Sequence, residues 1–91
     1  MTTKELERIF KVFGNRRRIA IVLYLRKRKE ATVGDVAEHI NLSFKATSKH
    51  LIILANAGVV ESEQRSLQMF YTISKDLSPT VRAILSILSI L

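Results

Sequence analysis

The apolar residues of this chain change their spacing at Gly58, and this change limits the possible folds more than any other feature. Before Gly58, apolar side chains recur every three or four residues, which is typical of amphipathic helices. After it come two short runs, residues 59–64 and 67–73, and the second run is rich in aromatic and β-branched residues. These runs predict two strands joined at Arg65 and Ser66. We therefore expect several helices followed by a β-hairpin.

Polar capping residues and glycines mark the ends of the expected helices. Thr32 with Asp35 three residues later resembles a capping box, and Ser78 before Pro79 is typical of a helix start. Gly58 is expected to stop a helix in the left-handed conformation. The expected helices are residues 3–13, Asn15 to the basic residues 26–29, Thr32 to Ile40, Ser43 to Gly58, and 79–91.

The expected elements follow one another in a characteristic order. A short third helix, a tight turn at Asn41 and Leu42, a longer fourth helix and the hairpin come in direct succession. This is the layout of a winged helix-turn-helix. We therefore predict a mainly α fold with a small β-hairpin, in the order α-α-α-α-β-β-α. With 91 residues, the chain is expected to form one domain, residues 1–91, whose small core a partner subunit would stabilise.

The chain is strongly basic, with fifteen Lys and Arg against eight Asp and Glu and a net charge of +7. This surplus is expected of a nucleic-acid binder, although a membrane surface or an acidic protein would also attract it. The charge alone therefore leaves these three classes of partner open.

Catalytic and metal-binding functions lack the residues that they need. There is no cysteine, and the two histidines, His39 and His50, fall on different expected helices. We predict no catalytic site, no metal site and no cofactor. The longest nearly apolar run, residues 83–91, is shorter than the about 20 residues that span a bilayer, and residues 1–5 lack a signal-peptide pattern. These features predict a cytoplasmic protein that does not enter a membrane.

The fourth expected helix carries the best candidates for DNA contact. With Leu51 at the centre of the buried face, Lys45 and Lys49 fall near the opposite side and Ser48 on the flank. Lysines can donate hydrogen bonds to guanine or phosphate in a major groove, and serine can contact either. Phe44 lies close to the direction of Leu51, so a place in the core is favoured. If exposed, Phe44 can offer only an apolar contact, for instance to a thymine methyl group.

Two further groups of arginines could contact phosphate. Arg16, Arg17 and Arg18 open the second helix, where at least two of them must face solvent. A phosphate clamp and a plain solvated face remain equally open for them. Arg65 is the basic residue near the hairpin tip, but Glu61 and Glu63 would repel phosphate there.

The first and last expected helices each carry a stripe of apolar residues that one small core cannot fully cover. These stripes predict a homodimer built on both helices. The predicted interface residues are Leu6, Ile9, Phe10, Phe13, Val81, Ile84, Leu85, Leu88 and Leu91.

The run from Asn41 to Leu51, continuing through Leu54 to Ala57-Gly58-Val59-Val60, resembles the recognition-helix region of ArsR-type winged-helix repressors. Gly14-Asn15 with Arg18 and Ile19 is similar to the family's second-helix start, and Met69-Phe70-Tyr71 is similar to the aromatic end of its wing. The similarity covers about residues 6–74.

The resemblance implies a dimer that places its two fourth helices in successive major grooves of a palindrome-like site. It implies DNA contacts at Phe44, Lys45, Ser48 and Lys49, with Ser43 as the helix cap. It divides the chain into a DNA-binding core, 15–74, with a wing, 59–73, and dimerisation helices, 3–13 and 79–91.

The chain also departs from this family in four ways. Thr32 and Gly34 stand where metal-sensing members have cysteines, and residues 78–91 contain no Asp, His or Glu. Ser66-Leu67 replaces a glycine-arginine pair at the wing tip, and Phe44 stands where a polar base-reading residue is common.

These observations predict a sequence-specific, homodimeric transcriptional regulator of double-stranded DNA that does not respond to metals. Repression is the commoner mode of regulation in the family that the chain resembles, and no effector is identified. One alternative is a winged helix that binds an acidic protein, which Glu61, Glu63 and Leu67 in the wing favour. The other is association with a membrane surface through the apolar C-terminal part and residues 26–29, but the last helix lacks a basic polar face.

Overall fold

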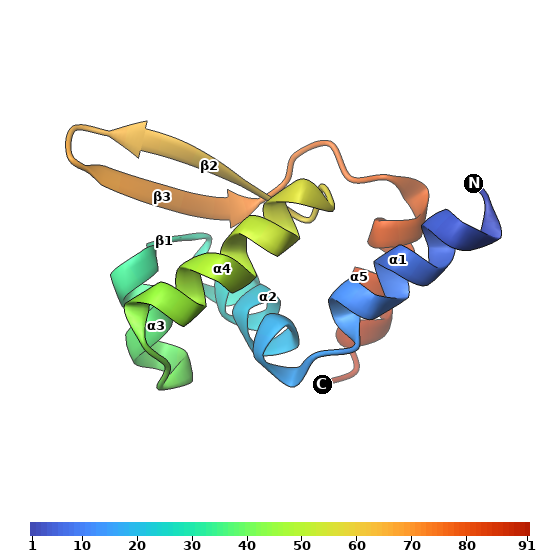
Figure 1. Ribbon diagram of the computed structural model, residues 1–91, viewed down its shortest axis with the longest axis horizontal. Helices are drawn as coiled ribbons and strands as arrows, with labels where there is room; N and C mark the ends of the chain where they lie inside the picture. Colours follow the sequence, from blue (N-terminus) through green and yellow to red (C-terminus); the bar gives the residue numbers. More distant parts are fainter.

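The secondary structure of the computed structural model, which describes residues 1–91, follows the expected order with one added strand (Figure 1). The elements are α1 (Thr3–Phe13), α2 (Arg16–Arg28), β1 (Glu30–Thr32), α3 (Val33–Ile40), α4 (Phe44–Asn56), β2 (Val60–Arg65), β3 (Gln68–Ile73) and α5 (Pro79–Leu88). The mainly α winged helix-turn-helix prediction is confirmed. No helix here combines the length and the apolar composition needed to span a bilayer.

Side-chain caps begin the helices at the expected residues. The side-chain oxygen of Asn15 accepts hydrogen bonds from the backbone N–H groups of Arg17 and Arg18, at 3.0 and 3.1 Å. Thr32 and Asp35 form the reciprocal capping box, with each side chain accepting from the other residue's backbone N–H. The hydroxyls of Ser43 and Ser78 cap α4 and α5. These caps satisfy N–H groups that a helix leaves free in its first turn.

Two helix ends differ in how well they were predicted. Gly58 follows α4 with φ of +74°, the left-handed conformation expected of a glycine at a helix end. The last helix ends at Leu88 and not at Leu91, because its final backbone N–H groups bond to carbonyls three residues back. This tighter turn is common where a helix runs out of partners.

The sheet has three antiparallel strands in the order β1-β3-β2. β1 was not predicted, because three residues are too few to show an alternating pattern. Its middle residue, Ala31, is buried opposite Tyr71 of β3, while Glu30 is exposed. β1 lies between α2 and α3, and its pairing with β3 therefore attaches this part of the chain to the hairpin.

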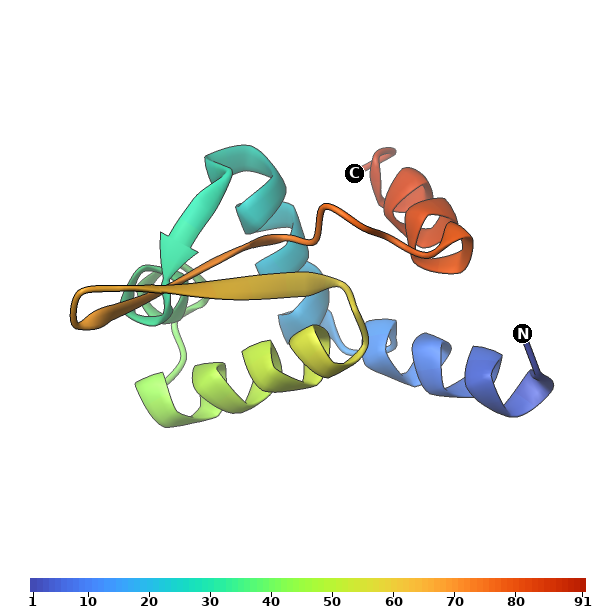
Figure 2. The same cartoon turned by 90° about the horizontal axis from the view of Figure 1, so that it is seen from above.

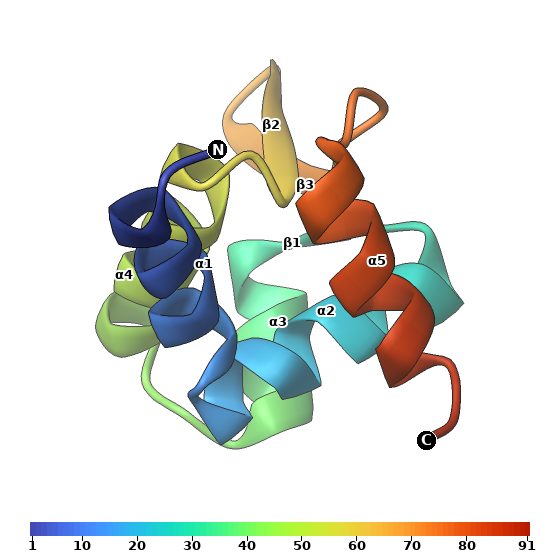
Figure 3. The ribbon, with the colours of Figure 1, turned by 90° about the vertical axis from the view of Figure 1, so that its right-hand side faces the viewer.

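The core lies around α2, whose Ile21, Val22 and Leu25 are almost fully buried. Val36 of α3 and Leu51 and Leu54 of α4 belong to the same apolar cluster. The hairpin extends from one end of this core, and α1 and α5 lie at the other end (Figures 1 and 2). Figure 3, which looks at that end, shows both helices facing the viewer, with α1 on the left and α5 on the right.

Two arginines of α2 hold the C-terminal ends of α1 and α5. The Arg18 guanidinium donates to the carbonyl oxygens of Val12 and Lys11, at 2.7 and 3.1 Å. The Arg26 guanidinium donates to the carbonyl oxygen of Leu85 at 2.7 Å and to the hydroxyl of Ser89 at 3.0 Å. The last carbonyls of a helix lack partners within it, and a cation suits that end of the helix dipole. α2 therefore positions both flanking helices.

The apolar stripes of α1 and α5 are shared between the core and the surface, which corrects the predicted dimer interface. Ile9, Phe13, Val81 and Leu85 are buried in the core of the chain itself. A small domain needs these side chains for its own core, so they leave no surface for a partner. Leu6, Ile84 and Leu88 are half-buried, whereas Phe10 and Leu91 remain 57% and 77% exposed. Ile87 and Ile90, outside the predicted interface set, are also exposed.

Candidate DNA-binding surface

The outer face of α4 carries the predicted basic strip. Lys45 and Lys49 are exposed, Ser48 is half-buried, and Ser43 caps the helix directly before them. On the opposite side, Thr47, Leu51 and Leu54 are completely buried, which fixes the rotation of the helix. The positively polarised N-terminal end of α4 and its two lysines thus face solvent together, an arrangement that suits an anion.

Phe44 is exposed, contrary to the expectation that it packs in the core. Its side chain is 63% accessible, although its angular position around α4 is close to that of Leu51. The separation of seven positions between Phe44 and Leu51 corresponds to about 10 Å along the helix axis. Phe44 therefore projects past the edge of the core at the first position of α4.

The three arginines at the start of α2 have different roles. Arg16 is exposed, and Arg17 is half-buried with its Nη1 3.5 Å from the carbonyl oxygen of Ile40. Both line a hollow beside His39 and Ile40. Arg18 instead serves the structure, since it binds the end of α1. Arg16 and Arg17 thus remain the candidates for phosphate contact in this group.

Arg65 is already paired within the wing. Its guanidinium contacts Glu63 at 2.7 Å and Glu30 at 2.8 Å, and it lies 4.6 Å from the centre of the Phe70 ring. The hydrogen bond with Glu63 is the main cause that raises the pKa of Arg65. Two carboxylates therefore balance the positive charge that the sequence analysis assigned to DNA contact. One of these carboxylates, Glu30, belongs to β1, a strand that was not predicted from the sequence.

His50 connects α4 to the end of α1 through Arg18. Its Nδ1 lies 3.2 Å from Nη1 of Arg18, and because a guanidinium only donates, Nδ1 is the acceptor. Burial, and then the charges of Arg18 and Arg17, lower the pKa of His50 from its usual value. His50 is thus kept neutral and bonds within the domain.

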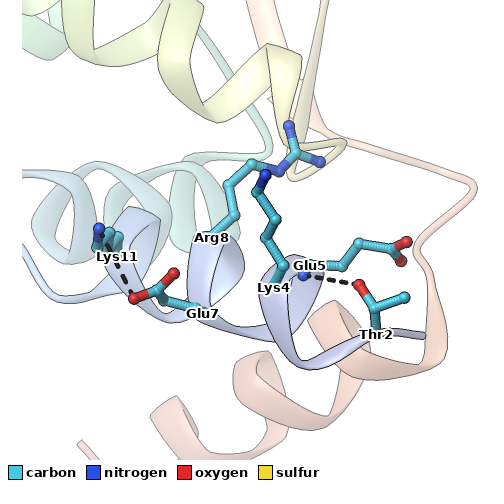
Figure 4. A pocket seen from close by; sticks show the side chains of 6 residues that line it. All are labelled: Thr2, Lys4, Glu5, Glu7, Arg8 and Lys11. Atoms are coloured by element: carbon cyan, nitrogen blue, oxygen red, sulfur yellow. Dashed lines mark hydrogen bonds and ion pairs between the residues drawn. The ribbon is translucent and has the colours of Figure 1, made fainter.

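Figure 4 shows a hollow along α1 that is lined by Thr2, Lys4, Glu5, Glu7, Arg8 and Lys11. Its lining is polar and comes from α1 and the cap before it, with Glu7 and Lys11 paired at 3.9 Å. No three His, Cys, Asp or Glu side chains of the chain gather into a group that could hold a metal ion.

Comparison with known proteins places this fold in a family. Residues 15–62, more than half of the chain, match the family described as bacterial regulatory protein, arsR family. The transcriptional activator HlyU of Vibrio cholerae is 32% identical over 80 residues, which cover 88% of this chain and 70% of HlyU. The transcriptional repressor SdpR of Bacillus subtilis is 33% identical over 69 residues, which cover 76% of each chain.

Solved structures agree with this assignment. The structure of reduced HlyU from Vibrio cholerae aligns with a TM-score of 0.78 at 30% identity, covering 94% of this chain and 86% of that one. A domain from Mycobacterium bovis, described as a homodimeric winged helix-turn-helix DNA-binding domain, has the same fold at 22% identity, with a TM-score of 0.78 and coverage of 96% and 77%. The chain belongs to the ArsR family of winged helix-turn-helix, DNA-binding transcriptional regulators.

Proposed function

We propose that this chain binds specific sites on duplex DNA as a homodimer, with α4 of each copy in a major groove, and that it represses transcription. The observation that carries the proposal is the strip behind the Ser43 cap, in which Lys45 and Lys49 are exposed and Ser48 is half-buried. The first residues of a recognition helix contact base edges and phosphates in this fold. Arg16 and Arg17, beside the end of α3, add phosphate contacts. The net charge of +7 supports the same partner.

The dimer rests on the exposed apolar side chains of α1 and α5 and the residues after α5, namely Phe10, Ile87, Ile90 and Leu91. Two recognition helices about one turn of DNA apart would then meet a palindrome-like site. In this proposal residues 15–74 form the DNA-binding core, and residues 3–13 and 79–91 form the interface. The Mycobacterium bovis domain of the same fold is described as homodimeric, which supports this arrangement.

The sign of regulation and the absence of a metal effector are parts of the proposal. The two named relatives differ in sign, since HlyU is an activator and SdpR a repressor. A regulator that only occupies its DNA site can block transcription without contacting any other protein. Repression therefore requires fewer contact surfaces than activation from a chain of this size. With no cysteine and two histidines, the chain lacks the three or four ligands of a zinc site. We further propose that it has no catalytic activity and acts in the cytoplasm, where its DNA would be.

The test is binding to a duplex selected from a random pool, compared with an unselected duplex over a range of salt concentrations. If a dimer neutralises about 8 phosphates, the log–log slope of affinity against salt is expected near −7. Lys45→Ala and Lys49→Ala should each weaken binding, by about five- to twentyfold for the loss of one charged contact. Lys27→Ala is the control, because Lys27 is exposed in the last turn of α2 and not on α4. Unchanged affinity in both α4 variants would contradict the proposed docking.

A further inference from the structure

Four apolar side chains meet beside the basic strip of α4, and we call them the apolar corner: Val33, Phe44, Leu67 and Met69. They line a hollow of about 360 Å³ and come from the start of α3, the start of α4 and the wing. Phe44 is 63% exposed, Leu67 96% and Met69 39%. The apolar corner thus lies where the recognition helix and the wing approach each other.

The composition of the apolar corner decides which DNA groups it can contact. The remaining lining residues are Thr32, Gly34 and Gln68, so no ionised side chain lines the hollow. This part of the surface therefore offers a phosphate no charged partner. In the major groove, the apolar group on a base edge is the C5 methyl of thymine, and apolar side chains recognise it by contact.

The position of Phe44 makes DNA the expected occupant of the apolar corner. Phe44 is adjacent to Lys45 and one helical turn before Ser48, so it is continuous with the strip that the proposed function places in the groove. It is also the first residue of α4 after the cap, and the N-terminal residues of a recognition helix reach the base edges. A DNA duplex that meets the two lysines would bring base edges within reach of Phe44.

We propose that Phe44 is a specificity-determining residue that selects thymine. Its ring packs against the C5 methyl of one thymine in each half-site, and the rest of the apolar corner shields this contact from water. The inference rests on the proposed function and deepens it by naming the base that the helix reads. Polar residues at this position would read a donor or acceptor instead, so Phe44 gives this chain a different preferred site.

The experiment replaces thymine by deoxyuridine, one position at a time, in the selected duplex. This exchange removes only the C5 methyl and keeps the base pair. At one thymine of each half-site, uracil should weaken binding of the full chain by about fourfold, the effect of exposing one buried methyl group. Replacing the same T·A pair by 5-methylcytosine·G should cost less than replacing it by C·G, because the methyl is retained.

Variants of the protein connect the methyl effect to Phe44. Phe44→Ala should bind more weakly and show no penalty for uracil at the same position. Ile52→Ala is the matched control, since Ile52 is 50% exposed on the same helix about 12 Å further along, and it should keep the fourfold penalty. Circular dichroism is expected to be unchanged in both variants, because both side chains lie largely outside the core.

The outcomes separate the two proposals. Specific binding by the full chain without uracil sensitivity at any thymine overturns the thymine contact and leaves the proposed function standing. A penalty that persists in Phe44→Ala also overturns it. A change of oligomeric state in Phe44→Ala would show that the apolar corner is a contact between copies, with the same consequence. If the full chain prefers no duplex at all, the proposed function fails first.

Discussion

Thr47 shows how a single buried group can limit the stability of this fold. It is completely buried in α4, yet its hydroxyl oxygen has no hydrogen-bond partner in the protein. A buried hydroxyl without a partner costs about 1–3 kcal/mol relative to its hydrated state. Valine has nearly the same shape without the hydroxyl.

Thr47→Val should therefore raise the free energy of unfolding by about 1 kcal/mol, as measured by urea denaturation. Thr47→Ser is the control, because it keeps the hydroxyl and removes the methyl, and it should lower stability by about 1 kcal/mol. A loss of stability in Thr47→Val would show that the hydroxyl is satisfied in solution.

His50 makes stability depend on pH in a direction that the structure fixes. Burial, and then Arg18 and Arg17, lower its pKa in the folded state below the usual 6.5. Below pH 6.5 the unfolded chain therefore binds this proton more readily than the folded one. The stability present above pH 6.5 is lost as the pH falls through the folded-state pKa.

We expect the native chain to lose more stability between about pH 7.5 and about pH 5 than His50→Gln, measured by urea unfolding at each pH. The glutamine oxygen can still accept from Arg18 but does not titrate. His39→Gln is the control, because His39 is exposed and stacks on Tyr24 at 4.1 Å, away from Arg18. Equal pH dependence in the native chain and His50→Gln would refute this role.

At the scale of the elements, the sequence predicted what is decided locally. Asn15, Thr32 with Asp35, Ser43 and Ser78 act on N–H groups two or three residues away, so their caps could be recognised without the fold. β1 could not be recognised, because Glu30–Thr32 forms a strand only where β3 lies beside it. The expectation for Phe44 was wrong for a related reason. Its angle on the helix was known, but not where the core ends along it.

The features of the candidate site also separate into those that local sequence predicts and those that depend on the fold. The exposure of Lys45 and Lys49 follows from helical spacing and was predicted correctly. The partners of Arg65 were not predicted, since Glu30 is 35 residues away and reaches it only through the sheet. Which apolar residues of α1 and α5 are buried in the core also depends on tertiary packing. Sequence patterns predicted which lysines are exposed, but they could not tell which charged side chains are paired within the protein.

Variants of the wing can test whether the ion pairs of Arg65 within the protein prevent it from contacting DNA. Glu63→Gln removes one of the two carboxylates that pair with Arg65 and leaves Glu30 in place. It should raise affinity for the selected duplex by about threefold and make the salt slope steeper. Glu61→Gln removes an equal charge from the same strand but leaves Arg65 paired, because Glu61 contacts Ser74. It should therefore raise affinity less and leave the slope unchanged. Equal gains in both variants would mean that only the net charge of the wing matters.

At the scale of the whole molecule, α2 links the proposed DNA-binding surface to the proposed dimer interface. Arg18 binds the end of α1 and contacts His50 of α4, while Arg26 binds the end of α5. The two helices that expose Phe10 and Ile87 are therefore held by the helix that also packs against α4. The angle between two copies, and with it the spacing of their recognition helices, would be set by these arginine contacts.

The last prediction concerns the dimer itself. Phe10 of α1, Ile87 of α5, and Ile90 and Leu91 after α5 are 57–86% exposed. The helices α1 and α5 lie at the end of the molecule opposite the wing (Figure 1). Burying these four side chains would contribute about 5 kcal/mol per chain before the costs of association, which favours a dimer at tens of micromolar.

Changing both Ile87 and Ile90 to Gln should shift the chain to a monomer in light scattering and weaken binding to the selected duplex. These positions are suitable because the buried Val81 and Leu85 would disturb folding instead. Leu67→Gln, exposed at the wing tip, should stay dimeric. A native chain that is monomeric at this concentration would refute the interface, as would a double variant that remains dimeric.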